Sequence, residues 1–319
     1  MTHRVDDFVN RFASSISDVN SIDRVVNESS GLSPREMHEA LGHARFSDDR
    51  AYGIQLMADF MNPNESRYFD AIYGSFYGQA DIRAWLVPTM ASIDFIDFRP
   101  MGDVVFLDDG LGTTSVDEWQ MFMGDIPLSK GVSVRRFRDG WITWACDVYD
   151  TAAFRVPGPD GEVAPLPPPP SPDEWTPDPS APVVAAKDVD FDADCDQFHP
   201  TDSTYIDPIF GDFHGRDAIR SWMVDVMGKV GNIEFVPVGP ELNDGTTYVQ
   251  EWVQMAVVPD GRRVPMTRGT SVRRYRNGST VHAADYFDTA TILAPEVIAA
   301  SVACGSTLTA EDIARYRQR

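Results

Sequence analysis

Two aspartates, Asp147 and Asp285, stand at matching places in two similar stretches of the sequence, and both are suited to proton transfer. Strand side chains alternate between two faces, so Asp147 shares a face with Tyr149 and Asp285 shares one with Phe287. A carboxylate among aromatic and methionine side chains loses hydration, which raises its pKa and lets it act as an acid or base near neutral pH. The alternative is an inward aspartate that only hydrogen-bonds to a tyrosine or to the backbone.

A Tyr-x-Asp pair occurs once in each stretch, as Tyr68 with Asp70 and as Tyr205 with Asp207. In an extended segment the two side chains of each pair point the same way, so they could orient a hydroxyl, an enol or a water. The alternative is that both aspartates cap the loop that leads into the next helix, with Pro208 fixing the turn in the second copy.

Other side chains are candidates for supporting roles. His214, beside the Gly215 turn and matched to Phe76 of the first copy, is a candidate proton carrier at the mouth of a pocket. The second copy is the one expected to be active. Side chains expected either to line a pocket or to fill the core are Trp85, Trp119, Trp222, Trp252, Gln254 and Phe287. Sheet-surface or inter-domain salt bridges are expected for Arg135, Arg136, Arg273 and Arg274.

The elements that position these residues occur twice. The segment that begins at Tyr68 returns at Tyr205, an offset of 137, and 131–140 returns as 269–278. Such a period is far too long for a solenoid repeat, so it indicates two whole domains. In each, a Gly-x-x-x-Gly turn (74–78 and 211–215) leads into a helix (about 78–90 and 215–227), and strand-like segments follow. Asp139-Gly140 and Asn277-Gly278 are typical of tight hairpins. The pattern predicts an α+β fold.

Composition shifts divide the chain further. We expect a helical extension over 1–49, in which Ser33 is the N-cap of a helix, and domain 1 over 50–154. Domain 2 is expected over 188–294, and a terminal helix with Thr309 to Asp312 as its capping sequence over 295–319. Residues 155–187 contain Pro167 to Pro170 in a row and read as an extended linker.

Charge and cysteine content narrow the function. The formal charge of −22 argues against a broad nucleic-acid-binding surface. The three cysteines show no CxxC spacing, and the histidines of His38-Glu39-Ala40-Leu41-Gly42-His43 are not spaced as HExxH, so we expect neither a metal nor another cofactor. With no membrane-length apolar run, we expect a cytoplasmic protein without membrane contact.

These motifs resemble the SnoaL-like branch of the nuclear transport factor 2-like superfamily. The resemblance rests on Tyr-x-Asp-Pro-x-x-Gly at Tyr205, on Glu-Trp at Glu118 and Glu251, and on the final Asp-Tyr-Phe-Asp at Asp285. It covers about 50–154 and 188–293. It implies two tandem cone-shaped (cystatin-like) domains, each a curved antiparallel sheet wrapped around helices, and an internal pseudo-dimer, monomeric or homodimeric.

The resemblance also implies function. Members include ketosteroid isomerase, polyketide cyclases, limonene epoxide hydrolase and non-catalytic binding domains, and cyclases and the hydrolase place a working aspartate where Asp147 and Asp285 stand. The hydrolase's Arg-x-Asp pair would fall on Trp119 and Met121, or on Trp252 and Gln254, which disfavours epoxide opening. We therefore expect a cofactor-independent isomerase, cyclase, dehydratase or hydratase for a steroid-, polyketide- or terpenoid-like molecule. The alternative is a non-catalytic binding or scaffold protein.

Overall fold

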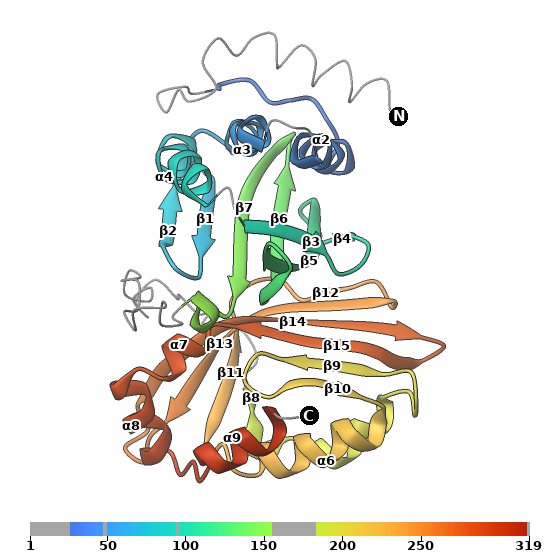
Figure 1. Cartoon of the computed structure of the whole chain (residues 1–319), viewed down its shortest axis with the longest axis vertical. Helices are drawn as coiled ribbons and strands as arrows, with labels where there is room; N and C mark the ends of the chain where they lie inside the picture. The colour runs from blue at the N-terminus through green and yellow to red at the C-terminus, as the bar shows by residue number, and fades with distance from the viewer. Residues whose placement is uncertain (1–25, 47–49, 94–95, 155–182, 318–319) are drawn as a thin grey trace. The chain divides into compact units, whose positions relative to one another are not determined.

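The computed structural model describes residues 26–46, 50–93, 96–154 and 183–317 and confirms the α+β class (Figure 1). Its residues form two compact units. The first comprises Met1–Asp70, Gly74–Leu128 and Ser133–Asp147, and the second comprises Ala71–Tyr73, Ser129–Val132 and Val148–Arg319. The helix expected before residue 26 and most of the expected linker lie outside the described residues.

The first sheet and its helices come from the first repeat. The helices are α2 (Pro34–Phe46), α3 (Arg50–Asp59) and α4 (Gly78–Ser92), and a 3₁₀ turn, η1 (Thr151–Phe154), follows the last strand. The strands are β1 (Arg67–Asp70), β2 (Gly74–Tyr77), β3 (Ile96–Pro100), β4 (Val105–Asp108), β5 (Thr113–Met123), β6 (Ile126–Arg138) and β7 (Trp141–Tyr149).

The second sheet and its helices come from residues 183–317. The helices are α5 (Phe191–Asp194), α6 (Arg216–Met227), α7 (Thr289–Ile292), α8 (Pro295–Ala303) and α9 (Ala310–Arg317), with 3₁₀ turns η3 (Ala186–Asp188) and η4 (Cys195–Gln197). The strands are β8 (Val184–Ala185), β9 (Thr204–Asp207), β10 (Gly211–His214), β11 (Ile233–Pro237), β12 (Leu242–Asn243), β13 (Thr247–Val257), β14 (Arg263–Arg276) and β15 (Ser279–Phe287).

The two sheets repeat one strand order, β2-β1-β7-β6-β5-β3 and β10-β9-β15-β14-β13-β11. The sheets were expected to be purely antiparallel, and neither is. Strand β1 pairs with β7 in parallel, and β9 pairs with β15 in parallel. This parallel pair is the means by which each Tyr-x-Asp segment lies beside the strand that carries the terminal aspartate.

Local sequence explains the hairpins. Asp139 and Asn277 have φ of 50° and 53°, and the glycines after them also have positive φ, as a tight hairpin requires. The expected Gly-x-x-x-Gly turn is instead a short strand between two glycines, β2 in the first repeat and β10 in the second. The hairpin β1–β2, or β9–β10, therefore leads directly into α4 or α6.

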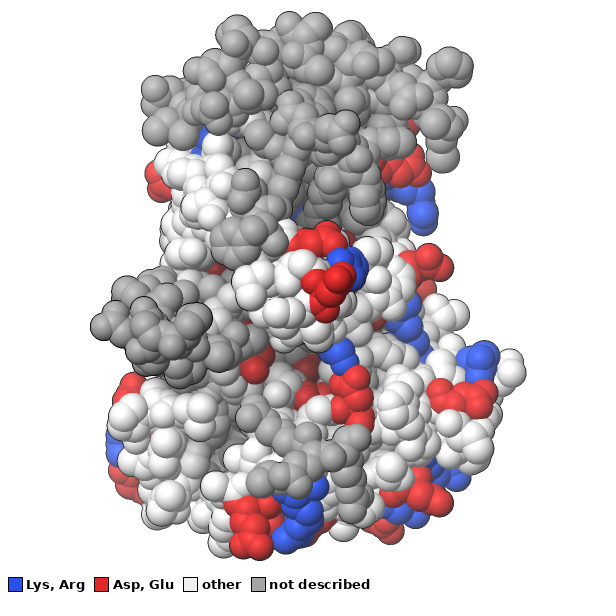
Figure 2. Space-filling model, in the orientation of Figure 1, with Lys and Arg blue, Asp and Glu red and all other residues white. Residues whose placement is uncertain are grey.

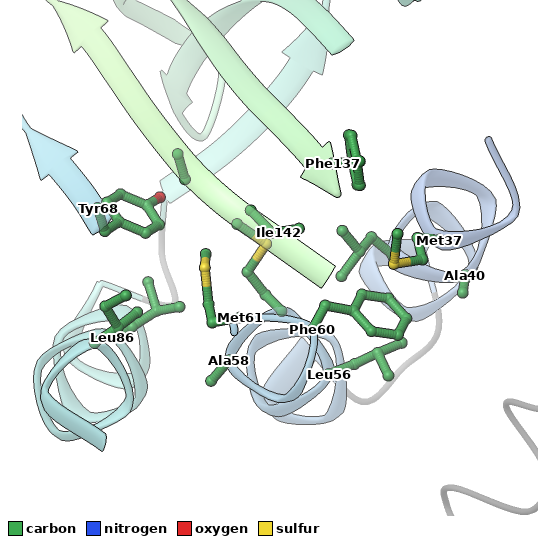
Figure 3. Packing of buried hydrophobic residues seen from close by; sticks show 14 of the residues in the cluster. Met37, Ala40, Leu56, Ala58, Phe60, Met61, Tyr68, Leu86, Phe137 and Ile142 are labelled. Carbon is green, nitrogen blue, oxygen red and sulfur yellow. The ribbon is translucent and has the colours of Figure 1, made fainter. Parts of the chain in front are cut away.

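The helices cover one face of each sheet. In the first unit Met37 of α2 and Leu56 of α3 pack in one buried cluster with Phe137 and Ile142 of the strands (Figure 3), and Ile82 of α4 belongs to the same cluster. Tyr68 of β1 belongs to this cluster, where Figure 3 shows it near Met61 and Leu86. Ser33 caps α2 as expected: Ser33 Oγ accepts from the N–H of Glu36, whose carboxylate accepts from the Ser33 N–H at 2.8 Å.

The C-terminal tail differs from expectation because it contains two helices, α8 and α9, instead of one. The expected capping sequence is present: Thr309 Oγ1 donates to Asp312 at 2.7 Å and accepts from the Asp312 N–H at 3.2 Å. Tyr316 of α9 packs with the core around α6. The end of the expected linker also differs, since Val184–Ala185 pairs with β11.

Charged side chains of both signs are interspersed on the described surface in Figure 2, with many Lys and Arg beside Asp or Glu. None of the helices in the described ranges combines the length and the apolar character needed to cross a bilayer.

Candidate functional site

The candidate site of the second repeat is a hydrogen-bonded cluster around Asp285. The Tyr205 hydroxyl donates to Asp285 Oδ2, and Ser271 Oγ donates to Oδ1 at 2.6 Å. Arg273 donates to the same Oδ1 from Nη1 and from Nη2, both at 3.1 Å. Trp252 Nε1 donates to Ser271 Oγ at 2.9 Å, which fixes the direction of the serine hydroxyl. Four strands therefore hold one carboxylate, whose side chain is 19% exposed.

The first repeat holds Asp147 in the same way, with one difference. Tyr68 donates to Asp147 Oδ2, Ser133 Oγ donates to Oδ1 at 2.6 Å, and Trp119 Nε1 donates to Ser133 Oγ at 2.9 Å. The Arg135 guanidinium is farther away, with Nη2 at 3.8 Å from Asp147 Oδ1. This distance makes an ion pair but no hydrogen bond.

Strand register assembles these groups. In the parallel pair, Tyr68 lies opposite Ala145 and Asp70 lies opposite Asp147, while Tyr205 lies opposite Ala283. The predicted inward faces of Asp147 and Asp285 are thus the faces that meet the tyrosines.

A β-bulge sets the other half of the second cluster. The register of β14 with β15 shifts between Arg274 and Tyr275, and beyond this shift Ser271 pairs with Asp285 and Arg273 pairs with Ala283. Directly opposed residues share a face, so Ser271 and Arg273 lie on the face of Asp285.

Burial and neighbouring charges set the protonation states of Tyr68, Tyr205 and Arg273. Desolvation, reinforced by Asp285 for Tyr205 and by Asp147 for Tyr68, raises the pKa of both hydroxyls well above 10.0. Both tyrosines are therefore neutral donors. Burial alone would lower the pKa of Arg273, but the charges of Asp285 and Tyr205 and the hydrogen bonds to Asp285 together outweigh burial and raise that pKa, so the guanidinium stays charged.

Asp207 caps the turn before α6 and is at the same time a buried carboxyl group. Its Oδ1 accepts from the N–H groups of Ile209 and Phe210 at 2.8 and 2.9 Å, which is the turn-capping alternative. It is also buried, and desolvation raises its pKa to about 7 against the backbone donors, with a further contribution from Asp285. Such a carboxyl group exchanges its proton near neutral pH. Asp70, its counterpart, is also buried.

His214 does not join the cluster. It pairs with Thr204 at the end of β10 and is exposed, while Phe213 pairs with Tyr205 and is buried. Phe76 pairs with Tyr68 in the same way, so its counterpart is Phe213, and the expected exchange of Phe76 for a histidine was wrong.

The tryptophans divide into two sets. Trp85 stacks on Phe76 at 4.2 Å and Trp222 stacks on Phe213 at 4.5 Å, within aromatic clusters that include the site tyrosines. Trp222 is a buried core residue. Its ring therefore packs against Tyr205 from within the core.

Trp252, like Trp119, is buried as a support for the site serine. Its ring covers Gly269, where an added Cβ would lie 2.3 Å from Cη2. Phe287 lies beside it, with ring centroids 6.0 Å apart. Gln254 is half-buried on the same strand, and its Oε1 has no hydrogen-bond donor among the described residues.

Four residues of the two clusters were not expected there: Ser133, Ser271, Arg135 and Arg273. The signal was present, because Ser-Val-Arg-Arg occurs in both repeats and alternation places its serine and first arginine on one face. The expectation of surface or inter-domain salt bridges was wrong for Arg273, which bonds to Asp285 within the second unit, and for Arg135, whose side chain is 5% exposed beside Asp147.

The model of the SnoaL-like domain matches residues 182–283. The second repeat is a SnoaL-like domain. The first repeat shares the strand order and the aspartate cluster of this SnoaL-like domain. No curated protein matches the chain.

Solved structures similar to this chain each cover about one repeat. A hypothetical protein with a ketosteroid isomerase-like fold from Catenulispora acidiphila is 19% identical, the match covers 34% of this chain and 83% of that protein, and the TM-score is 0.29. An NTF2-like protein from Burkholderia pseudomallei is 22% identical over 33% and 82% of the two chains, with a TM-score of 0.28. A putative SnoaL-like isomerase from Agrobacterium tumefaciens is 21% identical over 30% and 80%, with a TM-score of 0.26.

The chemistry open to the two clusters differs. An ionised carboxylate has about four acceptor positions. Asp285 accepts four hydrogen bonds, three on Oδ1 and one on Oδ2, and Arg273 donates two of them. Among the described residues Asp147 accepts only two, one on each oxygen, from Tyr68 and Ser133, so each oxygen retains an acceptor position.

Proposed function

We propose that this protein is a cofactor-independent enzyme that transfers a proton on a small hydrophobic molecule of steroid, polyketide or terpenoid type. Isomerisation, cyclisation, dehydration and hydration are the reactions that one carboxylate and one hydroxyl can serve. Asp147 is the proposed proton acceptor and Tyr68 the hydroxyl that orients it. The supporting observation is that Asp147 is fixed by two donors and still has acceptor capacity, with 19% of its side chain exposed.

The test needs a probe that requires only a base in apolar surroundings, since the natural substrate is unidentified. Ring opening of 5-nitrobenzisoxazole begins with removal of a proton from carbon and gives a coloured phenolate. We expect Asp147→Asn to lower the rate by about 10²-fold or more, the usual range for a general base. Asp285→Asn is the matched control and is expected to change it only slightly. Turnover no faster than in buffer, or equal rates for the two variants, would contradict the proposal.

A second candidate function for the second repeat is binding without catalysis. It is favoured by the crowding of Asp285 Oδ1, which accepts three hydrogen bonds, two of them from Arg273. Binding of a hydrophobic fluorophore that survives in Asp285→Asn, without any effect of this variant on turnover, would support it.

A further inference from the structure

The two arginines at matching positions, Arg135 and Arg273, differ in what they bond to. Arg273 donates to Asp285, to the Tyr205 hydroxyl at 3.2 Å, and to the carbonyl oxygens of Val272 and Ala284 at 3.1 and 3.0 Å. The Arg273 guanidinium therefore has its hydrogen-bond acceptors within the protein. Arg135 makes no comparable hydrogen bond within the part of the chain that the structure describes.

Arg135 is also more deeply buried than Arg273. Its side chain is 5% exposed against 22%, and its Nε is buried with no acceptor among the described residues. A buried guanidinium that lacks acceptors is costly, because the desolvation of its donors is not repaid. Asp147 compensates its charge in part, at 3.8 Å, without completing its hydrogen bonds.

Position adds to this contrast. Arg135 lies close enough to Tyr68 for its charge to oppose the rise in the tyrosine's pKa, and Tyr68 and Ser133 occupy one site each on Asp147. The Arg135 guanidinium, a hydrogen-bond donor, therefore lies next to the Asp147 carboxylate, the proposed base. If Asp147 took a proton from a carbon next to a carbonyl, the electron pair of the broken C–H bond would move to the carbonyl oxygen, and an enolate would form. A cation beside this oxygen would stabilise the charge that the transfer creates.

We infer that Arg135 of the first repeat holds an oxygen of the ligand that carries or develops negative charge, as in an enolate, a phenolate or a carboxylate. The ligand is a small hydrophobic molecule with one such oxygen at its polar end. This inference rests on the proposed function, and it assigns the oxygen-binding role to the first repeat. The second repeat lacks this role because Asp285, Tyr205 and two carbonyl groups already occupy Arg273.

The test uses 4-nitrophenol, whose phenolate absorbs visible light and whose phenol does not, with 4-nitroanisole as the probe that cannot ionise and benzoate as the carboxylate probe. The full chain should bind 4-nitrophenol, and the spectrum of the bound form should shift toward the phenolate. Arg135→Met should weaken this binding tenfold or more and abolish the spectral shift, while 4-nitroanisole binds both proteins equally. Benzoate binding that is lost in the same variant would extend the site to carboxylates.

Arg273→Met is the matched variant and should leave the spectral shift intact. Without ligand, Arg135→Met should change the melting temperature little or raise it, since an unsatisfied buried charge is removed. Arg273→Met should lower it, since four acceptors lose their donor.

Three results would overturn the inference: no phenolate binding, a spectral shift that survives in Arg135→Met, or a fall in melting temperature for Arg135→Met as large as that for Arg273→Met. The last result would mean that Arg135 has a purely structural role, with water as its partner. Loss of phenolate binding in Arg135→Met together with turnover that ignores Asp147→Asn would leave this inference standing and refute the proposed function. Turnover that requires Asp147, without any phenolate binding, would refute this inference and leave the proposed function standing.

Discussion

Asp207→Asn isolates the cost of one buried charge. Asp207 Oδ1 accepts two backbone N–H groups, and an asparagine Oδ1 can accept both, so the substitution removes the charge and keeps the turn. Burial raises the pKa of Asp207 from 3.8 to about 7 in the folded protein. Between these values the folded state binds a proton that the unfolded state has lost.

The sign and size follow from this difference. As pH rises from 3.8 toward 7, the wild-type carboxyl group progressively destabilises the folded state, because its ionised form is the less favoured one there. A difference of about three pH units corresponds to about 4 kcal/mol in full. The stability of Asp207→Asn relative to wild type should therefore increase by up to about 3 kcal/mol between pH 4.5 and 7.

Melting temperatures of both proteins across this pH range provide the measurement. For a unit of 150–250 residues, about 3 kcal/mol corresponds to roughly 6–12 °C. Asp217→Asn, on the exposed side of α6, is a control that should show no such pH dependence. A difference between Asp207→Asn and wild type that stays constant from pH 4.5 to 7 would refute the reasoning, because it would mean that the buried carboxyl group is not desolvated.

Three further substitutions test the second cluster. Tyr205→Phe leaves Asp285 Oδ2 without its donor and should cost about 1–3 kcal/mol, measured by denaturant unfolding; no loss would show that the hydroxyl is not bonded. Ser271→Ala removes the acceptor of Trp252 Nε1 and should cost a similar amount and change tryptophan fluorescence, whereas an unchanged spectrum would argue against this contact. Gly269→Ala should cost about 1–3 kcal/mol because its Cβ would overlap the Trp252 ring, and a neutral result would mean that the ring moves freely.

Much of the fold was predictable from local patterns. The turns at Asp139-Gly140 and Asn277-Gly278, the capping sequence at Ser33 and the inward face of the terminal aspartates depend on neighbouring residues, which is why the sequence predicts them. The hydrogen bond between Tyr205 and Asp285 was also predictable, once both side chains were assigned to the same expected pocket. The mixed sheet was not, because a parallel pair joins segments about 80 residues apart and leaves no periodic signal between them.

The sequence by itself determined that one architecture occurs twice. It also identified Tyr68, Tyr205, Asp147 and Asp285 as polar residues of the two candidate sites, because each has a counterpart at the matching place in the other repeat. Only the tertiary structure decided the partners of Asp285. Continuing the pairing of Tyr275 with Thr280 without a shift would set Thr270 opposite Asp285, and the bulge sets Ser271 there instead. One extra residue in a strand exchanges the two faces, so the bulge determines which polar side chains meet the carboxylate. The contrast between Arg135 and Arg273 likewise depends on a difference of less than one ångström, 3.8 against 3.1 Å, between identical sequence motifs.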